Sequence, residues 1–255
     1  MSGDAPQAAT LDARNPAGGT GGPEGSDAGA AAAVKSTADA TVGGSTSGPA
    51  GPAVGDVHRF VAGTSGGTLL VLHGTGGDEN DLLPLARELA PEANLLAPRG
   101  PVLEQGMPRF FRRLGVGVFD EADLERRTAE LARFVRAAAA RHGFDPARVV
   151  ALGYSNGANI AASLLLRDGS VLAGAVLLRP VLPFEPLQLP DLAGRGVFIA
   201  AGRRDPYAPI ERVEALADAL RRAGAAVELA WSGGGHSLER GELDQAARWL
   251  QRHAP

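Results

Sequence analysis

The stretch VALGYSNGANI, residues Val150–Ile160, places an apolar strand, a G-x-S-x-G turn and the start of a helix in direct succession. A turn of this kind holds a serine in strained backbone geometry with its hydroxyl exposed. Small residues at Gly153 and Gly157 allow the strand and the helix to approach closely. We therefore predict that Ser155 is a nucleophile. Because the chain has 35 glycines among 255 residues, the motif could arise by chance, and partner residues must support it.

A serine hydroxyl is a weak nucleophile unless a base removes its proton, and a third group must orient that base. In enzymes built on such a turn, the acid and then the histidine follow the serine along the chain. The chain has five histidines, and only His236 and His253 follow Ser155. His253 is close to the C-terminus, where fraying is common, whereas His236 lies in a Gly-rich loop after an apolar segment. We predict His236 as the base; the alternative is a solvated loop histidine.

The acid is predicted from the apolar segment 197–202, which indicates a buried strand. Asp205 follows this strand almost immediately, so it would lie at the same end of the sheet as the other motifs. The alternative for Asp205 is a turn-initiating Asp-Pro step. Asp191 is a weaker candidate because it lies in a Pro-rich linker before the strand.

A fourth motif lies upstream, where the apolar segment 68–72 leads into the Gly-rich sequence His73-Gly74-Thr75-Gly76-Gly77-Asp78. Backbone N–H groups in such a turn can converge on a developing oxyanion. We assign the two donors of this oxyanion hole to the N–H groups of Thr75 and Asn156. His73 is expected to fix the loop by hydrogen bonds rather than to take part in the chemistry.

The composition of the chain argues against several other classes of function. The chain has no cysteine, which removes disulfides and thiolate metal sites, and its net charge of −4 argues against a nucleic-acid or anionic membrane surface. No run of about 18 apolar residues could span a bilayer. We expect a cytoplasmic enzyme without a metal or cofactor that acts on a small-molecule ester, with no nucleic-acid partner and no integral membrane association. Whether it forms a homodimer is left open.

Two regions differ sharply in composition. Residues 1–56 are rich in small and polar residues with almost no large apolar side chain, which predicts a disordered, low-complexity tail that is not a secretory signal. Alternatively, translation starts further downstream and this tail is never made. Residues 57–255 alternate apolar strands with amphipathic helices and suit one domain. The pattern predicts an α/β fold with a mostly parallel central sheet, helices on both faces and no large lid domain.

These motifs together resemble the phospholipase/carboxylesterase family of the α/β-hydrolase superfamily, which includes the acyl-protein thioesterases. The resemblance runs from His58 to the C-terminus, and it is closest to bacterial hydrolases encoded beside hydroquinone or quinone dioxygenases. It implies an α/β-hydrolase fold and ester hydrolysis. Thioesterase members usually carry Gln-Gly-Gly after the serine, whereas this chain has Asn-Gly-Ala, which argues against depalmitoylation. The matching segments are Leu72–Asp81, Pro98–Pro101, Gly106–Arg113, Gly153–Ala158, Arg179–Pro180, Gly202–Pro206 with Pro209, and Gly233–Ser237.

Substrate specificity is expected to come from the irregular connection between about Pro98 and Asp120, which could form a partial lid. Met107, Phe110 and Phe111 could line an acyl or aromatic pocket there, or they could simply close the edge of the core. His73 is a further candidate for this pocket. The absence of a large lid insertion favours small, soluble substrates over aggregated lipid.

Arginines in the same region have two interpretations. Arg109 and Arg179, with Arg112 and Arg113, could clamp an anionic substrate group by bidentate hydrogen bonds. Alternatively, they could pair with nearby carboxylates and pin the long loop. The carboxylates available for such pairing are Glu104, Asp120, Glu121 and Glu185.

The predicted activity is that of a serine hydrolase that cleaves carboxylic esters through an acyl-enzyme. Thioesters and lysophospholipids are alternative substrates. A different class of function is a non-catalytic α/β-hydrolase-fold protein that binds a ligand without turning it over. The joint presence of Ser155, Asp205 and His236 favours the enzyme.

Overall fold

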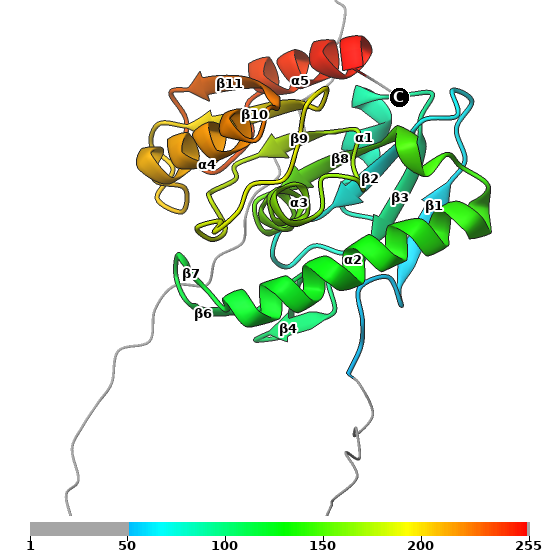
Figure 1. Cartoon of the computed structure of the whole chain (residues 1–255), viewed down its shortest axis with the longest axis horizontal. Helices are drawn as coiled ribbons and strands as arrows, with labels where there is room; N and C mark the ends of the chain where they lie inside the picture. Colours follow the sequence, from blue (N-terminus) through cyan, green and yellow to red (C-terminus); the bar gives the residue numbers. More distant parts are fainter. Residues whose placement is uncertain (1–50, 254–255) are drawn as a thin grey trace, which may run out of the picture. The chain divides into compact units, whose positions relative to one another are not determined.

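A seven-stranded sheet forms the centre of the protein in this computed structural model, which describes residues 51–253 (Figure 1). The strand order is β1-β3-β2-β8-β9-β10-β11. Strand β1 pairs antiparallel with β3, and the other neighbouring strands of the sheet pair in parallel. The strands are β1 (His58–Val61), β2 (Thr68–Leu72), β3 (Asn94–Pro98), β8 (Val149–Tyr154), β9 (Gly174–Leu178), β10 (Gly196–Gly202) and β11 (Ala226–Ser232). The predicted α/β class with a mostly parallel sheet is confirmed.

Helices cover both faces of this sheet. The helices are α1 (Leu83–Leu89), α2 (Glu121–His142), α3 (Asn156–Arg167), α4 (Ile210–Arg222) and α5 (Arg240–His253), with a short 3₁₀ turn η1 (Pro146–Arg148) before β8. Side chains alternate between the faces along each strand. In β2, Leu70 and Leu72 pack into the core formed with α2, α3 and α4, whereas Leu69 and Val71 pack into the core formed with α1 and α5. Burial on both faces explains why the strands are continuous apolar runs.

The parallel arrangement brings the four sequence motifs to one edge of the sheet. Strands β2, β8, β10 and β11 each end immediately before one motif, and the carboxyl ends of parallel strands lie at the same edge. The register aligns Leu72 with Gly153 and Gly202 with Ser232. The turn after β2 is therefore next to Ser155, and the loop of Asp205 is next to the loop of His236.

The connection from β3 to α2 is folded into two short antiparallel hairpins. Strand β4 (Val102–Glu104) pairs with β5 (Met107–Arg109), and β6 (Arg113–Gly115) pairs with β7 (Val118–Phe119). Phe110 and Phe111, which join the two hairpins, are fully buried in the main core. Both hairpins are therefore anchored to the domain rather than attached as a loose flap. Among residues 51–253, no helix combines the length and the apolar character needed to cross a bilayer.

Packing of the domain starts earlier than the predicted boundary between residues 56 and 57. Val54 is buried in the main core, its N–H donates to a carboxylate oxygen of Glu130, and the carbonyl of Pro52 accepts from Arg127. A single apolar side chain within a polar segment has no periodicity, so composition could not indicate this contact. The rest of the predicted tail, residues 1–50, lies outside the described residues.

We expect Val54→Ala to lower the free energy of unfolding by about 1–3 kcal/mol, because it removes two buried methyl groups and leaves a cavity. Urea denaturation of the full chain measures this change. Val57→Ala is the matched control, because Val57 is half exposed and its truncation should change stability little. Equal effects of the two substitutions would show that Val54 does not pack into the core.

Candidate active site

Ser155 occupies a strained turn between β8 and α3. Its backbone angles are φ 52° and ψ −112°, a region that residues with a side chain rarely adopt and that clusters at functional sites. A Cβ atom added to Gly157 would lie 2.0 Å from the carbonyl oxygen of Leu72, and one on Gly153 would lie 2.6 Å from that of Gly157. The small residues thus allow α3 to begin against the ends of β2 and β8, as the motif predicts.

A chain of hydrogen bonds joins the three predicted residues Ser155, His236 and Asp205. Ser155 Oγ lies 2.9 Å from Nε2 of His236, and Nδ1 of the same ring lies 2.7 Å from Oδ2 of Asp205. When Nδ1 carries the proton that Asp205 accepts, Nε2 is free to accept a proton from the serine hydroxyl. The structure therefore brings together a hydroxyl, a base and an orienting carboxylate.

Asp205 is held as a carboxylate although its side chain is fully buried. Burial alone would raise the pKa of this group, but the hydrogen bond and the charge of His236, together with the N–H of Tyr207, outweigh it and leave the pKa below its ordinary value. An ionised Asp205 can fix the orientation of the imidazole at neutral pH.

The rejected alternatives for base and acid lie elsewhere in the domain. His253 is at the end of α5, where its ring stacks on Trp249 at 4.4 Å between centroids. Asp191 is exposed and accepts a hydrogen bond from the N–H of Ala193 in a local turn. Neither residue contacts Ser155.

The two predicted oxyanion donors have a common support. Asn156 is the first residue of α3, so its N–H has no acceptor within the helix. Its side-chain Oδ1 accepts from the N–H of Phe110 at 2.7 Å. Thr75 Oγ1 accepts from Arg109 at 2.7 Å, and the next N–H, that of Gly76, donates to Pro108 at 2.9 Å. Residues 108–110 thus brace both backbone turns from the same side.

His73 is a buried structural residue. Its side chain accepts the N–H of Gly100 at Nε2, at 2.9 Å, and its Nδ1 lies 2.6 Å from the carbonyl of Gly74. Burial lowers the pKa of His73 below its ordinary value, although nearby carboxylates oppose the shift. The ring therefore joins the turn after β2 to the turn after β3 as a neutral imidazole. Its side chain is 1% exposed, which favours the structural role over a place among the pocket residues.

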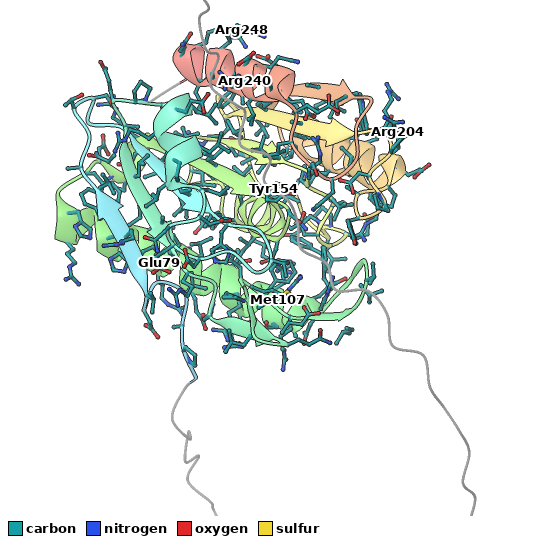
Figure 2. All side chains as sticks on the ribbon, turned by 180° about the vertical axis from the view of Figure 1, so that it is seen from behind. Glu79, Met107, Tyr154, Arg204, Arg240 and Arg248 are labelled. Carbon is teal, nitrogen blue, oxygen red and sulfur yellow. The ribbon has the colours of Figure 1, made fainter. Side chains whose placement is uncertain are left out.

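The structure places two of the three side chains of the predicted aromatic pocket in the core. Phe110 and Phe111 are fully buried in the core: Phe110 lies against His73, with 4.7 Å between ring centroids, and Phe111 contacts Phe119 edge to face at 5.1 Å. Their burial favours the alternative that they close the edge of the core. Met107, on β5, is partly buried and lies beneath Tyr154 in the view of Figure 2. Of the three candidates, Met107 is the one that remains available to a substrate.

Pairing with carboxylates explains three of the four arginines. Arg109 and Arg113 both contact Glu104, at 3.2 Å and 2.8 Å, and Arg112 contacts Asp120 at 2.9 Å. Burial, with some repulsion from Arg113, lowers the pKa of Arg109 to about 10, so this guanidinium still carries its charge at neutral pH. These contacts pin the two hairpins, and they do not form an open anion clamp.

Arg179 is the fourth arginine, and its contacts favour the alternative of pairing with a carboxylate over a place in the substrate pocket. Its side chain is completely buried and pairs with Glu242, at 2.6 Å, which was not among the predicted partners. Sequence reasoning missed Glu242 because it lies 63 residues away, in the first turn of α5. It also missed Tyr154, whose hydroxyl donates to the carbonyl of His236 at 3.1 Å. Burial raises the pKa of Tyr154 to about 12, so its hydroxyl keeps the proton that it donates.

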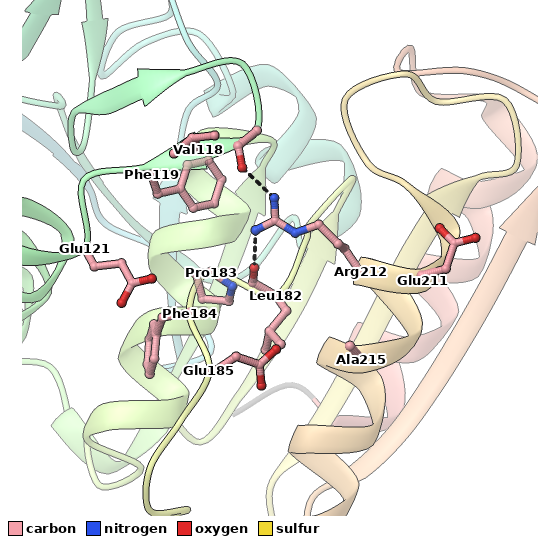
Figure 3. A pocket seen from close by; sticks show the side chains of 11 residues that line it. Val118, Phe119, Glu121, Leu182, Pro183, Phe184, Glu185, Glu211, Arg212 and Ala215 are labelled. Atoms are coloured by element: carbon pink, nitrogen blue, oxygen red, sulfur yellow. Dashed lines mark hydrogen bonds between the residues drawn. The ribbon is translucent and has the colours of Figure 1, made fainter.

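A groove of about 460 Å³ lies between the β6–β7 hairpin, the segment that follows β9, and α4 (Figure 3). Arg212 crosses it and donates to the carbonyls of Gly117 and Leu182, at 2.6 Å and 2.7 Å, which ties the hairpin to the opposite wall. The walls combine apolar side chains with glutamates, and they are formed by Gly117, Val118, Phe119, Glu121, Leu182, Pro183, Phe184, Glu185, Glu211, Arg212 and Ala215. No sequence pattern predicts this groove, because its walls are far apart in the chain.

The lowered pKa of His73 predicts a pH-dependent contribution to stability. The unfolded chain binds a proton at His73 below about pH 6.5, whereas the folded chain resists it. The contribution of His73 to the free energy of unfolding is therefore fully present above that pH. It decreases as the pH drops through the pKa of His73 in the unfolded chain, and it stops changing below the pKa of His73 in the folded chain. His73→Asn should remove this part of the slope in the free energy of unfolding between pH 8 and 5. An unchanged slope in urea denaturation would contradict the assignment.

Comparison with known proteins agrees with this geometry. A model of the dienelactone hydrolase family matches residues 111–247, a range that includes Ser155, Asp205 and His236. MhqD of Bacillus subtilis (strain 168) is 53% identical over 194 residues, which cover 76% of this chain and 97% of MhqD.

Two of the solved structures that are similar to this chain in fold and sequence are carboxylesterases. A carboxylesterase of Bacillus cereus is 51% identical with a TM-score of 0.75, covering 76% of this chain and 93% of that one. A carboxylesterase from Mesorhizobium loti is 36% identical with a TM-score of 0.69, covering 74% and 90%. The predicted resemblance to α/β-hydrolases of the carboxylesterase type is confirmed. The chain belongs to the dienelactone hydrolase family and is a hydrolase of the dienelactone hydrolase and carboxylesterase type.

Proposed function

We propose that this hydrolase cleaves carboxylic esters of small molecules through a covalent acyl-enzyme. Ser155 acts as the nucleophile, His236 as the general base and acid, and Asp205 as the group that orients the imidazole. The observation that carries this proposal is the continuous hydrogen-bond chain from Ser155 Oγ through His236 to Asp205, with lengths of 2.9 Å and 2.7 Å. It starts at a serine whose strained backbone presents the hydroxyl at the edge of the sheet.

The reaction proceeds in two halves. Ser155 Oγ attacks the ester carbonyl carbon while Nε2 of His236 takes the hydroxyl proton, and the N–H groups of Thr75 and Asn156 stabilise the oxyanion. The tetrahedral intermediate then expels the alcohol, which receives the proton from His236. A water molecule, deprotonated by His236, next attacks the acyl-serine, and the carboxylic acid leaves as Ser155 regains its proton.

Neutral esters fit the arginine contacts better than anionic ones. Arg109, Arg112, Arg113 and Arg179 are all paired with carboxylates, so the anion-clamp hypothesis loses its support. The similarity of this chain to two proteins described as carboxylesterases, 51% and 36% identical, supports esters as its substrates. Thioesters and lysophospholipids remain alternative substrates of the same chemistry, and ligand binding without turnover is the alternative of another class.

We expect Ser155→Ala to reduce kcat for short p-nitrophenyl esters by about 10⁴–10⁶, because the covalent step is lost. Asp205→Asn should reduce kcat by about 10⁴, because the imidazole loses its orienting acceptor. Ser163→Ala is the matched control: Ser163 lies on α3 and bonds Thr128 at 2.7 Å, away from His236, so kcat should stay near that of the wild type.

Steady-state kinetics of the purified proteins, with thioesters of the same acyl chain measured in parallel, test this proposal. Near-normal ester turnover by Ser155→Ala would refute the mechanism. A wild-type protein that binds the esters but does not turn them over would support the non-catalytic alternative.

A further inference from the structure

The loop that carries His236 is held mainly by donors from other segments. Residues 232–237 have the sequence SGGGHS, and a run of glycines loses much conformational freedom when it becomes ordered. Six consecutive carbonyls of this loop accept a hydrogen bond from another segment. The donors, in order from Ser232 to Ser237, are Arg203 N, Arg204 Nε, Arg204 N, Arg179 Nε, Tyr154 Oη and Arg179 Nη2.

Arg179 supplies the two hydrogen bonds that flank His236. Its Nε donates to the carbonyl of Gly235 at 2.8 Å, and its Nη2 donates to that of Ser237 at 2.7 Å. A guanidinium is planar, so its N–H groups leave at fixed angles. Two donors on one rigid plane therefore fix the spacing and direction of the peptide groups on either side of His236.

Glu242 holds this plane in place from the other side. Its two carboxylate oxygens accept from Nη1 and Nη2 of Arg179 at 2.6 Å and 2.7 Å, in the bidentate arrangement that gives geometric specificity. Glu242 is itself fixed in the first turn of α5, where the helix dipole favours a carboxylate and where Oε2 accepts the N–H of Glu239 at 2.9 Å.

The backbone conformation of Arg179 directs its side chain toward the His236 loop. Its φ is 59°, an uncommon value for a residue with a side chain, and its N–H donates to Ala200 on β10 at 2.8 Å. The residue follows β9, which lies in the sheet between the strands that lead to Ser155 and to Asp205. Its buried guanidinium therefore reaches the His236 loop from the centre of the site.

We propose that Arg179 is a positioning residue, which, clamped by Glu242, holds the imidazole of His236 between Ser155 and Asp205. The proposal deepens the proposed esterase function and rests on it. The competing interpretation is a buried ion pair that only adds stability. Removing one partner of a buried pair lowers the stability of the fold in either case, whereas only a misplaced base directly slows proton transfer.

Arg179→Met tests the proposal, with Arg127→Met as the matched control. Arg127 is also buried, pairs with Glu130 at 2.8 Å and donates to a backbone carbonyl, but it lies on α2 and holds the segment at Pro52. The measurements are kcat and KM for a neutral p-nitrophenyl ester, the urea midpoint, and the low-field proton resonance of the His236 Nδ1–H in the ligand-free protein.

We expect Arg179→Met to lower kcat about 10²-fold with KM little changed, and to weaken or broaden the low-field resonance. Arg127→Met should lower the urea midpoint while it retains both kcat and the resonance. Equal losses of kcat in the two variants, or an unchanged resonance in Arg179→Met, would overturn the proposal. The resonance is measured without substrate, so a wild-type protein that shows it without ester turnover would sink the proposed function alone.

Arg179→Lys keeps the test decisive if the Met variant does not fold. Lysine retains the charge but lacks the planar fork, so it can bond one flanking carbonyl well but not both in fixed geometry. We expect Arg179→Lys to have a kcat between that of the wild type and that of Arg179→Met, and a broadened His236 resonance. Wild-type kcat together with a wild-type resonance in Arg179→Lys would show that charge alone matters and would refute the positioning role.

Discussion

The turn at Ser155 is the constraint on which the rest of the structure depends. A serine with a φ of 52° must be held there by its surroundings, because this backbone conformation costs about 1–3 kcal/mol. The close contact of Gly157 with the end of β2, and the pairing of β8 between β2 and β9, supply that restraint. The same contacts bring the turn of Thr75 next to the first residue of α3. Sheet register thus determines where the proposed nucleophile and both proposed backbone donors lie.

His236 and Asp205, the proposed base and acid, depend on a different kind of support. Their loops contain glycines and turns that could not hold a fixed shape alone, so buried polar side chains hold them. Tyr154, directly before the nucleophile, bonds the carbonyl of His236, and Arg179 bonds the carbonyls on either side of it. Within residues 51–253, rigid strands therefore place the serine, while a hydrogen-bond network places the histidine. The structure combines a strained turn with a braced loop.

The sequence predicted most reliably those features that depend on residues adjacent in the chain. Apolar runs predicted β8, β10 and β2, because such a run is a property of neighbouring residues. The motif at the end of each strand predicted Ser155, Asp205 and His236 as a group, and the structure places them in hydrogen-bond contact.

Contacts between distant segments could not be predicted in the same way. Phe110 and Phe111 are of a residue type that often lines pockets, but their burial depends on how two hairpins pack on the core. Arg179 lies beside the motif strands, yet its role follows from Glu242, which no local pattern connects to it. Val54 is a single apolar residue in a polar stretch, and only its contact with the core shows that it belongs to the domain.

Covalent labelling tests the central claim most directly, because only a serine activated by a neighbouring base reacts rapidly with a fluorophosphonate. The measurement is mass spectrometry of the labelled protein and of its peptides. We predict one phosphonate adduct, located on Ser155, and a strongly reduced rate of labelling in His236→Ala. An adduct on another residue, no adduct, or equal labelling after the loss of His236 would contradict the account.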